Sequence, residues 1–187
     1  MAMISTSDFR NGMTLNLDDG LYNLVEFQHV KPGKGGAFVR TTLKNARTGQ
    51  VIDRTFRAGE KVDRATLNKR EMQFLYRDAD DYVFMDSTTY EQLNVGPTAL
   101  AVAASFLVEN MSAILVMYED EIIEVELPAS VELTVTETEP GLQGDRVSGA
   151  RKAATLETGK VVQVPLFVNI GDRVKVDTRS GDYLTRA

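Results

Sequence analysis

The sequence predicts an all-β protein built from three small β-barrel domains. Many short runs of β-branched, aromatic and aliphatic residues recur along its 187 residues. Clusters of Gly, Asn, Asp and Pro separate these runs at regular intervals, and a single stretch has helical spacing. About five short strands in each third of a chain is the pattern of small closed sheets. We place the domains at residues 1–64, 65–128 and 129–187.

The first third reads as a barrel with one prominent hairpin. Its strand-like runs are residues 13–17, 21–30, 37–44 and 51–56. Asp18-Asp19-Gly20 and the stretch 45–50, which holds Thr48-Gly49, provide turns between them. Residues 58–60 are expected to begin the exit toward the second domain.

The second third reads as four strands and a short helix. The expected strands are residues 71–76, 82–85, 113–118 and 122–127. Residues 97–108 are expected to be a helix, because proline suits a first helical turn and apolar residues follow at helical spacing. A helix that packs against and closes a barrel is the simplest interpretation of this stretch.

The last third again reads as strands, with one long loop at residues 140–150. The expected strands are residues 131–136, 161–168, 173–177 and 183–186. Pro165 lies inside the second of these, and proline cannot donate a ladder hydrogen bond. That strand should therefore lie at a sheet edge or contain a bulge.

The most informative stretch is Lys31-Pro32-Gly33-Lys34-Gly35-Gly36, between the runs 21–30 and 37–44. Pro-Gly and Gly-Gly pairs between two strand-like runs mark a turn. Lys34 is therefore expected near the tip of a hairpin, with no bulky neighbour. Residues 27–52 contain five Lys or Arg residues and no acid. Such a cation suits contact with a polyanion or acceptance of a chemical modification.

Charge is distributed unevenly over the chain. The net charge of −6 divides into +3 for residues 1–64, −9 for residues 65–128 and 0 for residues 129–187. The first third can approach RNA, whereas the middle third should repel it. Two interpretations of the acidic middle third stay open. In one, its surface only promotes solubility. In the other, it faces away from RNA or binds a basic protein.

The composition gives no positive sign of catalysis. Without cysteine there is no disulfide, zinc–thiolate site or thiol nucleophile. His29 is the sole histidine, so no multi-histidine metal site exists, and we interpret it as a structural or surface residue. Lys34 is followed by Gly and then a strand, unlike a phosphate-binding loop. We therefore expect no enzyme activity, no cofactor and no metal.

Nothing in the sequence suggests a membrane or secreted protein. Residues 1–12 lack the apolar segment of a signal peptide. The longest mostly apolar window, residues 97–108, is too short to span a bilayer. We expect a soluble, cytoplasmic protein.

Several segments spread over essentially the whole chain carry a family resemblance. They are residues 31–40, 55–61, 82–86 and 90–92, the pattern Lys152-x-Ala154, Gly159, Val162, Val164-Pro165, Val168, Gly171, and residues 177–183. Together these segments resemble the bacterial elongation factor P family. The pattern from Lys152 to Gly171 is similar to the family's signature in its C-terminal domain. The glycine-lysine loop supports the same resemblance.

The resemblance implies an SH3-like (KOW-like) barrel followed by two OB-fold barrels in a bent, tRNA-like shape. Family members bind the ribosome beside peptidyl-tRNA and relieve stalling at consecutive prolines without being enzymes. The implied partners are the ribosome, peptidyl-tRNA (tRNA-Pro), ribosomal RNA and a Lys34-modifying enzyme, with the factor acting as a monomer. In many relatives the residue matching Lys34 carries a covalent extension of the β-lysine or aminopentanol type.

The resemblance also implies roles for individual residues. Lys34 would contact the tRNA end, and Arg40, Tyr183 and Arg186 would contact RNA. Support for the loop would come from Lys31, Pro32, Gly33, Gly35 and Gly36, and the codon-proximal loop would be Gly144, Asp145 and Arg146. Two positions depart from the family pattern, since Arg146 replaces a usual Thr and Ala153 a usual Pro.

Other interpretations stay open at the level of sequence. A generic OB-fold RNA-binding protein would need exposed stacking aromatics, and the chain is 7% aromatic with no tryptophan. An elongation factor P-like paralogue with a different target is another. A third is a protein-interaction module that uses the acidic middle domain.

Overall fold

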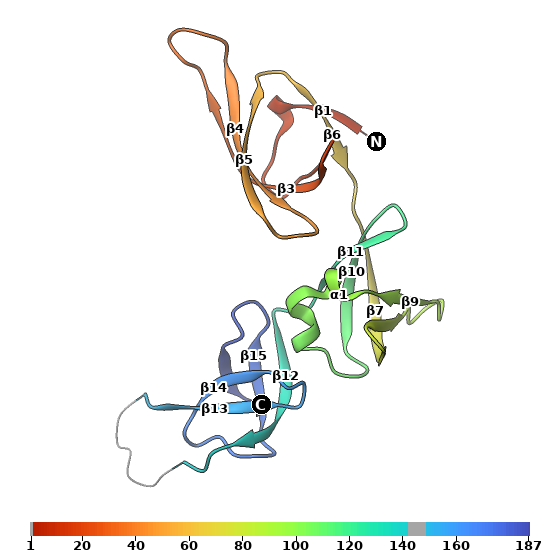
Figure 1. The fold of residues 1–187 in the computed structure, drawn as a ribbon, viewed down its shortest axis with the longest axis vertical. Helices are drawn as coiled ribbons and strands as arrows, with labels where there is room; N and C mark the ends of the chain where they lie inside the picture. Colours follow the sequence, from red (N-terminus) through yellow and green to blue (C-terminus); the bar gives the residue numbers. More distant parts are fainter. Residues whose placement is uncertain (1, 142–148) are drawn as a thin grey trace. The chain divides into compact units, whose positions relative to one another are not determined.

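The computed structural model describes residues 2–141 and 149–187, and in these ranges the chain forms three antiparallel sheets in sequence order (Figure 1). The predicted all-β class is confirmed. Each third of the chain supplies one sheet of five or six strands.

The first sheet has the strand order β1-β6-β2-β3-β4-β5. Its strands are β1 (Ala2–Ser5), β2 (Thr14–Leu17), β3 (Gly20–Val30), β4 (Phe38–Asn45), β5 (Val51–Arg57) and β6 (Lys61–Ala65). The expectation that residues 58–60 leave the domain is wrong. They form a turn with Gly59 at φ +80°, and β6 then returns to pair with both β1 and β2.

A compact apolar core fills the first barrel. It consists of Phe9, Leu15, Tyr22, Leu24, Val39, Leu43, Phe56 and Val62. Phe9 meets Phe56 edge to face at 5.7 Å between ring centroids. Buried aromatic and branched side chains from every part of the sheet make this barrel a rigid base for its long hairpin.

The second sheet has the order β11-β10-β7-β8-β9. Its strands are β7 (Asn68–Asp78), β8 (Asp81–Met85), β9 (Gln92–Val95), β10 (Ser112–Tyr118) and β11 (Glu121–Glu126). The helix predicted over residues 97–108 is shorter, with an α-helical turn α1 (Pro97–Leu100) and a 3₁₀ turn η2 (Ala101–Ser105). Ala101 has φ +43°, which interrupts the helix. The apolar spacing reflects burial of Leu100 and Ala103 in these short turns and of Leu107 just after them.

The third sheet has the order β14-β13-β12-β15-β16. Its strands are β12 (Ser130–Thr138), β13 (Arg151–Leu156), β14 (Val161–Pro165), β15 (Arg173–Asp177) and β16 (Tyr183–Arg186). Since β14 lies at the edge and ends at Pro165, the expected position of this proline is confirmed. The apolar core between these strands is mostly valine and leucine.

The chain divides into two compact units. The first comprises Met1–Arg70 and Leu115–Glu124, and the second comprises Glu71–Ile114 and Val125–Ala187. The turn of the β10–β11 hairpin therefore belongs to the same unit as the first barrel. Over the two described ranges, no helix combines the length and apolar character that crossing a membrane requires.

Candidate functional site

The candidate site lies at one end of a long β-ribbon formed by β3 and β4, with β5 paired along the other edge of β4. The pairing runs from Tyr22↔Asn45 at the base to Val30↔Phe38 at the far end, with a bulge near Leu24. The loop of residues 31–37 closes the far end, where Figure 1 shows the hairpin extending away from the barrel. The predicted hairpin with Lys34 in its connecting loop is therefore present.

Every residue of the loop 31–37 is exposed. Gly35 adopts φ +108°, a conformation that L side chains rarely adopt. A Cβ atom added at Gly33 or Gly36 would meet nothing within 4 Å, so the loop is open around Lys34. Among the described residues, no hydrogen bond or ion pair engages the Lys34 ammonium group. Its charge is free to bind an external anion.

The ribbon beneath the loop is held by packing on its inner side. Phe27 meets both Phe9 and His29 edge to face, at centroid distances of 6.2 and 5.6 Å. Val39 is completely buried, and the Thr41 hydroxyl donates to the Arg54 carbonyl at 2.7 Å. His29 itself is exposed and is the outermost of these rings. The ribbon therefore gives an open loop an ordered support.

The outer face of the ribbon carries two further cations, Arg40 and Arg57. Arg40 is exposed and pairs in register with Thr55, while the next row toward the loop pairs Phe38 with Arg57. Residues two apart on neighbouring strands share a face, so Arg57 lies diagonally beside Arg40. Within the described ranges neither guanidinium has an ion-pair or hydrogen-bond partner. Arg40 was predicted as an RNA contact and Arg57 was not singled out, because only the strand register brings the two together.

This cationic side ends within two rows of the loop. The following row contains Glu26, Thr42 and Asp53, and the Thr42 hydroxyl bonds the Asp53 carboxylate at 2.9 Å. Repulsion from Glu26 and Asp53 restricts any phosphate contact to the half of the ribbon that carries the loop.

The other predicted RNA contacts lie on the third sheet. Tyr183 and Arg186 both belong to β16. Tyr183 is half-buried against the core of that sheet, and exposed Arg186 forms an ion pair with Asp172 at 3.9 Å. The predicted codon-proximal residues Gly144, Asp145 and Arg146 lie outside the described residues.

The base of the loop 140–150 contains a buried lysine that sequence reasoning treated only as part of a family pattern. Lys152 is 9% exposed, and its ammonium group donates to the Glu139 carbonyl at 2.5 Å. A Cβ atom added at Gly141 would lie 2.6 Å from the Leu166 carbonyl oxygen, so that position requires glycine. The first contact fixes the chain just before this loop, and the close approach at Gly141 fixes the second residue of the loop.

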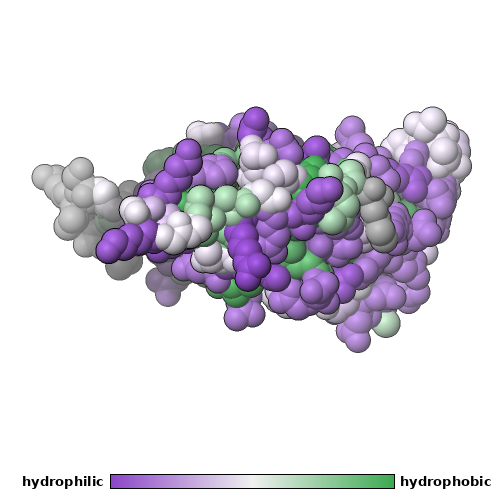
Figure 2. Space-filling view, turned by 90° about the horizontal axis from the view of Figure 1, so that it is seen from above, coloured by the Kyte–Doolittle hydropathy of each residue, from purple (hydrophilic) through white to green (hydrophobic). Residues whose placement is uncertain are grey.

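The surface in the view of Figure 2 is largely hydrophilic, and its hydrophobic residues are divided among small separate patches. The described part of the chain holds no cluster of three or more His, Cys, Asp or Glu residues suited to a metal ion. The prominent chemical feature is thus an accessible cation on a loop.

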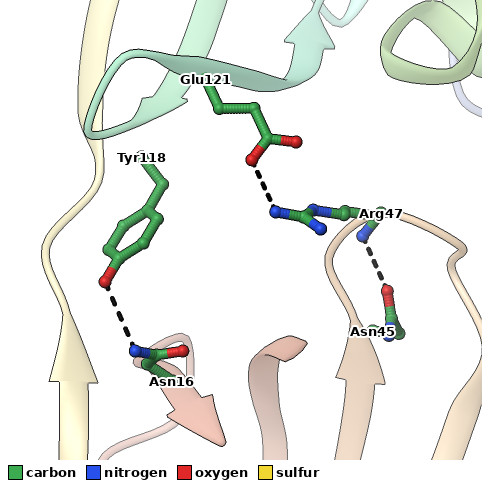
Figure 3. A network of polar contacts seen from close by, with 5 residues as sticks. All are labelled: Asn16, Asn45, Arg47, Tyr118 and Glu121. Atoms are coloured by element: carbon green, nitrogen blue, oxygen red, sulfur yellow. Dashed lines mark hydrogen bonds and ion pairs between the residues drawn. The ribbon is translucent and has the colours of Figure 1, made fainter. Parts of the chain in front are cut away.

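The base of the ribbon differs from its tip because its cation has a partner. Arg47, in the turn between β4 and β5, forms a 2.6 Å ion pair with Glu121 at the turn of the β10–β11 hairpin (Figure 3). Beside it, the Asn16 amide donates to the Tyr118 hydroxyl oxygen at 3.5 Å. Desolvation, with the charges of Glu119 and Asp63, raises the pKa of Tyr118. These effects favour the neutral phenol of Tyr118 over its phenolate.

Three family models match successive parts of the chain. They are described as "Elongation factor P (EF-P) KOW-like domain" over residues 5–62, "Elongation factor P (EF-P) OB domain" over residues 67–125, and "Elongation factor P, C-terminal" over residues 131–186. The chain belongs to the elongation factor P family. The KOW-like barrel followed by OB domains is the fold class that the sequence predicted.

Similar proteins cover nearly the whole chain. Elongation factor P of Acidothermus cellulolyticus is 59% identical over 185 residues, covering 99% of each chain. That of Moorella thermoacetica is 58% identical over 185 residues, covering 99% of this chain and all of the relative. Family membership supports a role as a translation elongation factor, in a process that involves the ribosome and tRNA.

Solved structures of lower identity share the fold. "Eukaryotic translation initiation factor 5A from Methanococcus jannaschii" matches with a TM-score of 0.54 at 21% identity, covering 66% of this chain and 93% of that one. "Translation initiation factor eif-5a family protein from Naegleria fowleri" matches with a TM-score of 0.55 at 15% identity, covering 67% of this chain and 98% of that one. These likenesses concern the fold alone.

Proposed function

We propose that this protein binds the ribosome beside peptidyl-tRNA and promotes peptide-bond formation at consecutive prolines. The observation that carries the proposal is the exposed Lys34 ammonium group, which has no partner among the described residues and lies on a glycine-rich loop. A stiff ribbon with a packed inner side supports that loop. The arrangement suits a cation that reaches into an RNA-lined site.

The proposed mechanism is one of orientation. Proline is a poor nucleophile in peptide transfer because its ring restricts the approach geometry. Holding the end of peptidyl-tRNA in a reactive pose lowers the barrier by reducing the entropy lost on reaction. Lys34 would bind phosphate and sugar oxygens at that end. The bond-forming chemistry stays with the ribosome, so in this proposal the protein is not an enzyme and needs no cofactor.

Lys34 is also the proposed site of a covalent extension of the β-lysine or aminopentanol type. The open space around Gly33 and Gly36 leaves room for a modifying enzyme and for a longer side chain. Intact-mass measurement on protein from its native host tests this point. An unmodified mass would remove the extension from the mechanism and leave the bare ammonium group.

The remaining proposed contacts follow the family resemblance. Arg40, Tyr183 and Arg186 would contact ribosomal RNA or tRNA, and the loop containing Gly144, Asp145 and Arg146 would approach the codon. The protein would act as a monomer in the cytoplasm, where its ribosomal partner is found. If phosphate contacts by the first barrel contribute to ribosome binding, the affinity should fall as salt rises.

The decisive experiment compares wild type with Lys34→Ala on a reporter with three consecutive prolines. Losing a charged hydrogen bond of about 1–3 kcal/mol predicts a loss on the order of ten- to hundredfold in the assisted step. Lys44→Ala, which removes an exposed lysine at the base of the same ribbon, is the matched control and should retain most of the activity. Equal read-through by wild type and Lys34→Ala would refute the role of Lys34.

A further inference from the structure

The base of the β3–β4 ribbon rests on the turn of the β10–β11 hairpin through a contact that the proposed function does not use. Its apolar part is a cluster of Leu21, Ala65, Val116 and Ile123, each at most 5% exposed. Its polar part is the Arg47–Glu121 ion pair and the Asn16–Tyr118 hydrogen bond (Figure 3). We call this set of residues the hairpin contact. All of them belong to one compact unit.

The turn that presents Arg47 is held in a fixed conformation. The Asn45 side-chain oxygen accepts hydrogen bonds from the backbone N–H groups of Arg47 and Thr48, both at 2.9 Å. The Ala46 N–H donates to the Leu21 carbonyl at 2.8 Å, which joins the turn to the first residues of β3. Arg47 is thus directed at Glu121 by the same residues that close the base of the ribbon.

Beside this contact, one short segment of the chain links the first barrel to the second sheet. The path from the barrel to the second sheet is the segment 66–67, between the end of β6 and the start of β7. Without the hairpin contact, this segment alone would hold the barrel to β10 and β11. Loss of the contact would therefore give the barrel, and Lys34 with it, greater orientational freedom.

Because the ribbon is long, a small rotation at its base produces a large displacement of the loop at its tip. Eight residue steps separate Tyr22 from Val30 along β3, which is about 27 Å at the rise of a strand. A rotation of about 5° at the base then moves the loop by roughly 2 Å. Misplacement by about 1 Å at a reacting centre can cost on the order of a hundredfold in rate. Positional control of Lys34 therefore depends on how firmly the base is held.

We infer that Arg47 and Glu121 are positioning residues for Lys34, which act by holding the base of the ribbon on the β10–β11 hairpin. This inference rests on the proposed role of Lys34 in peptide-bond formation. The apolar cluster supplies most of the attachment, because both partners of the ion pair are about half exposed and such pairs are weak. The ion pair selects one orientation among those that the apolar contact allows.

Charge reversal tests the inference. Arg47→Glu and Glu121→Arg each place like charges together, whereas the double reversal restores an attractive pair. At saturating factor, we expect each single variant to lower the maximal rate of proline–proline bond formation by about three- to tenfold. The factor concentration for half-maximal effect and the thermal midpoint should change little. The double variant should return to within about twofold of wild type.

Two further measurements separate positioning from a merely structural role. In a Lys34→Ala background the single reversals should have no additional effect on rate, because the residue that they position is gone. Since the chain has no cysteine, Arg47→Cys with Glu121→Cys gives two unique thiols. Joining them with a short bis-maleimide should raise the maximal rate relative to the same variant left unlinked.

The outcomes distinguish this inference from the proposed function. If wild type itself gives no Lys34-dependent acceleration, the proposed function fails. If wild type accelerates the reaction but both single reversals do so equally well, the inference is overturned. It is also overturned if the reversals lower the rate to the same extent in the presence and absence of Lys34.

Discussion

The two ends of the β3–β4 ribbon carry the same kind of group under opposite conditions. At the tip, Lys34 lies between glycines and has no partner among the described residues. At the base, Arg47 is held by Asn45 and paired with Glu121. The same ribbon thus leaves the Lys34 cation able to bind an external anion and holds the Arg47 cation in an ion pair. The difference shows that exposure alone does not identify a functional cation, because both side chains are accessible to solvent.

Leu43→Ala should reduce the stability of the protein most, because it removes core packing from the ribbon between its two ends. Leu43 is completely buried in the first barrel and lies opposite Leu24 and Ile52. Loss of a buried leucine side chain should reduce the free energy of unfolding by about 2–5 kcal/mol. Urea denaturation measures this change. Val51→Ala, at an exposed position of the same sheet, is the control and should stay within about 0.5 kcal/mol of wild type; a similar loss in both variants would contradict the assigned core.

Asn45→Ala should weaken the base and leave the tip unchanged. The substitution removes an acceptor for two backbone N–H groups, which predicts a loss of about 1–2 kcal/mol. Hydrogen exchange should show faster exchange at residues 46–49, with residues 31–37 unaffected. Gln50→Ala is the matched control, because Gln50 contributes its backbone carbonyl to this turn. Unchanged exchange at residues 46–49 would show that Asn45 does not hold the turn.

Gly35→Ala should have the smallest effect on stability, and it tests the tip alone. Alanine at a backbone φ of +108° is strained, and the expected cost is about 1 kcal/mol or less because the loop is open and can relax. Gly33→Ala is the matched control, since Gly33 has no positive φ and a Cβ atom added there would meet nothing within 4 Å. A larger loss of proline read-through for Gly35→Ala than for Gly33→Ala would link the loop conformation to function. Equal read-through by the two variants would mean that this conformation is not needed.

Local signals predicted most strands and missed particular ones. Alternating runs of β-branched residues, as in β12 and β15, have a period that a strand requires and a helix cannot satisfy. The strands β1, β6, β9 and β13 were not predicted. They are four to six residues long and polar or mixed in composition, and they are strands because neighbouring strands supply their hydrogen bonds. The helix over residues 97–108 was overestimated for the converse reason, since burial of apolar side chains can imitate helical spacing.

The candidate site was predicted only in part. Lys34 could be found because glycine and proline mark turns directly in the sequence. Arg57 could not, because its position beside Arg40 depends on which residues of β4 and β5 face each other. The pairing of Arg47 with Glu121 joins residues 74 positions apart, and no local pattern encodes it.

The sequence by itself determined the all-β class, the family and the hairpin with Lys34 at its tip. Each depends on residue types and spacings within short segments, where propensity and turn chemistry act. The tertiary structure alone decided which strands meet, which cations share a face and which cation is engaged. Those features depend on register and on packing between distant segments, where a shift of one residue moves every side chain to the other face.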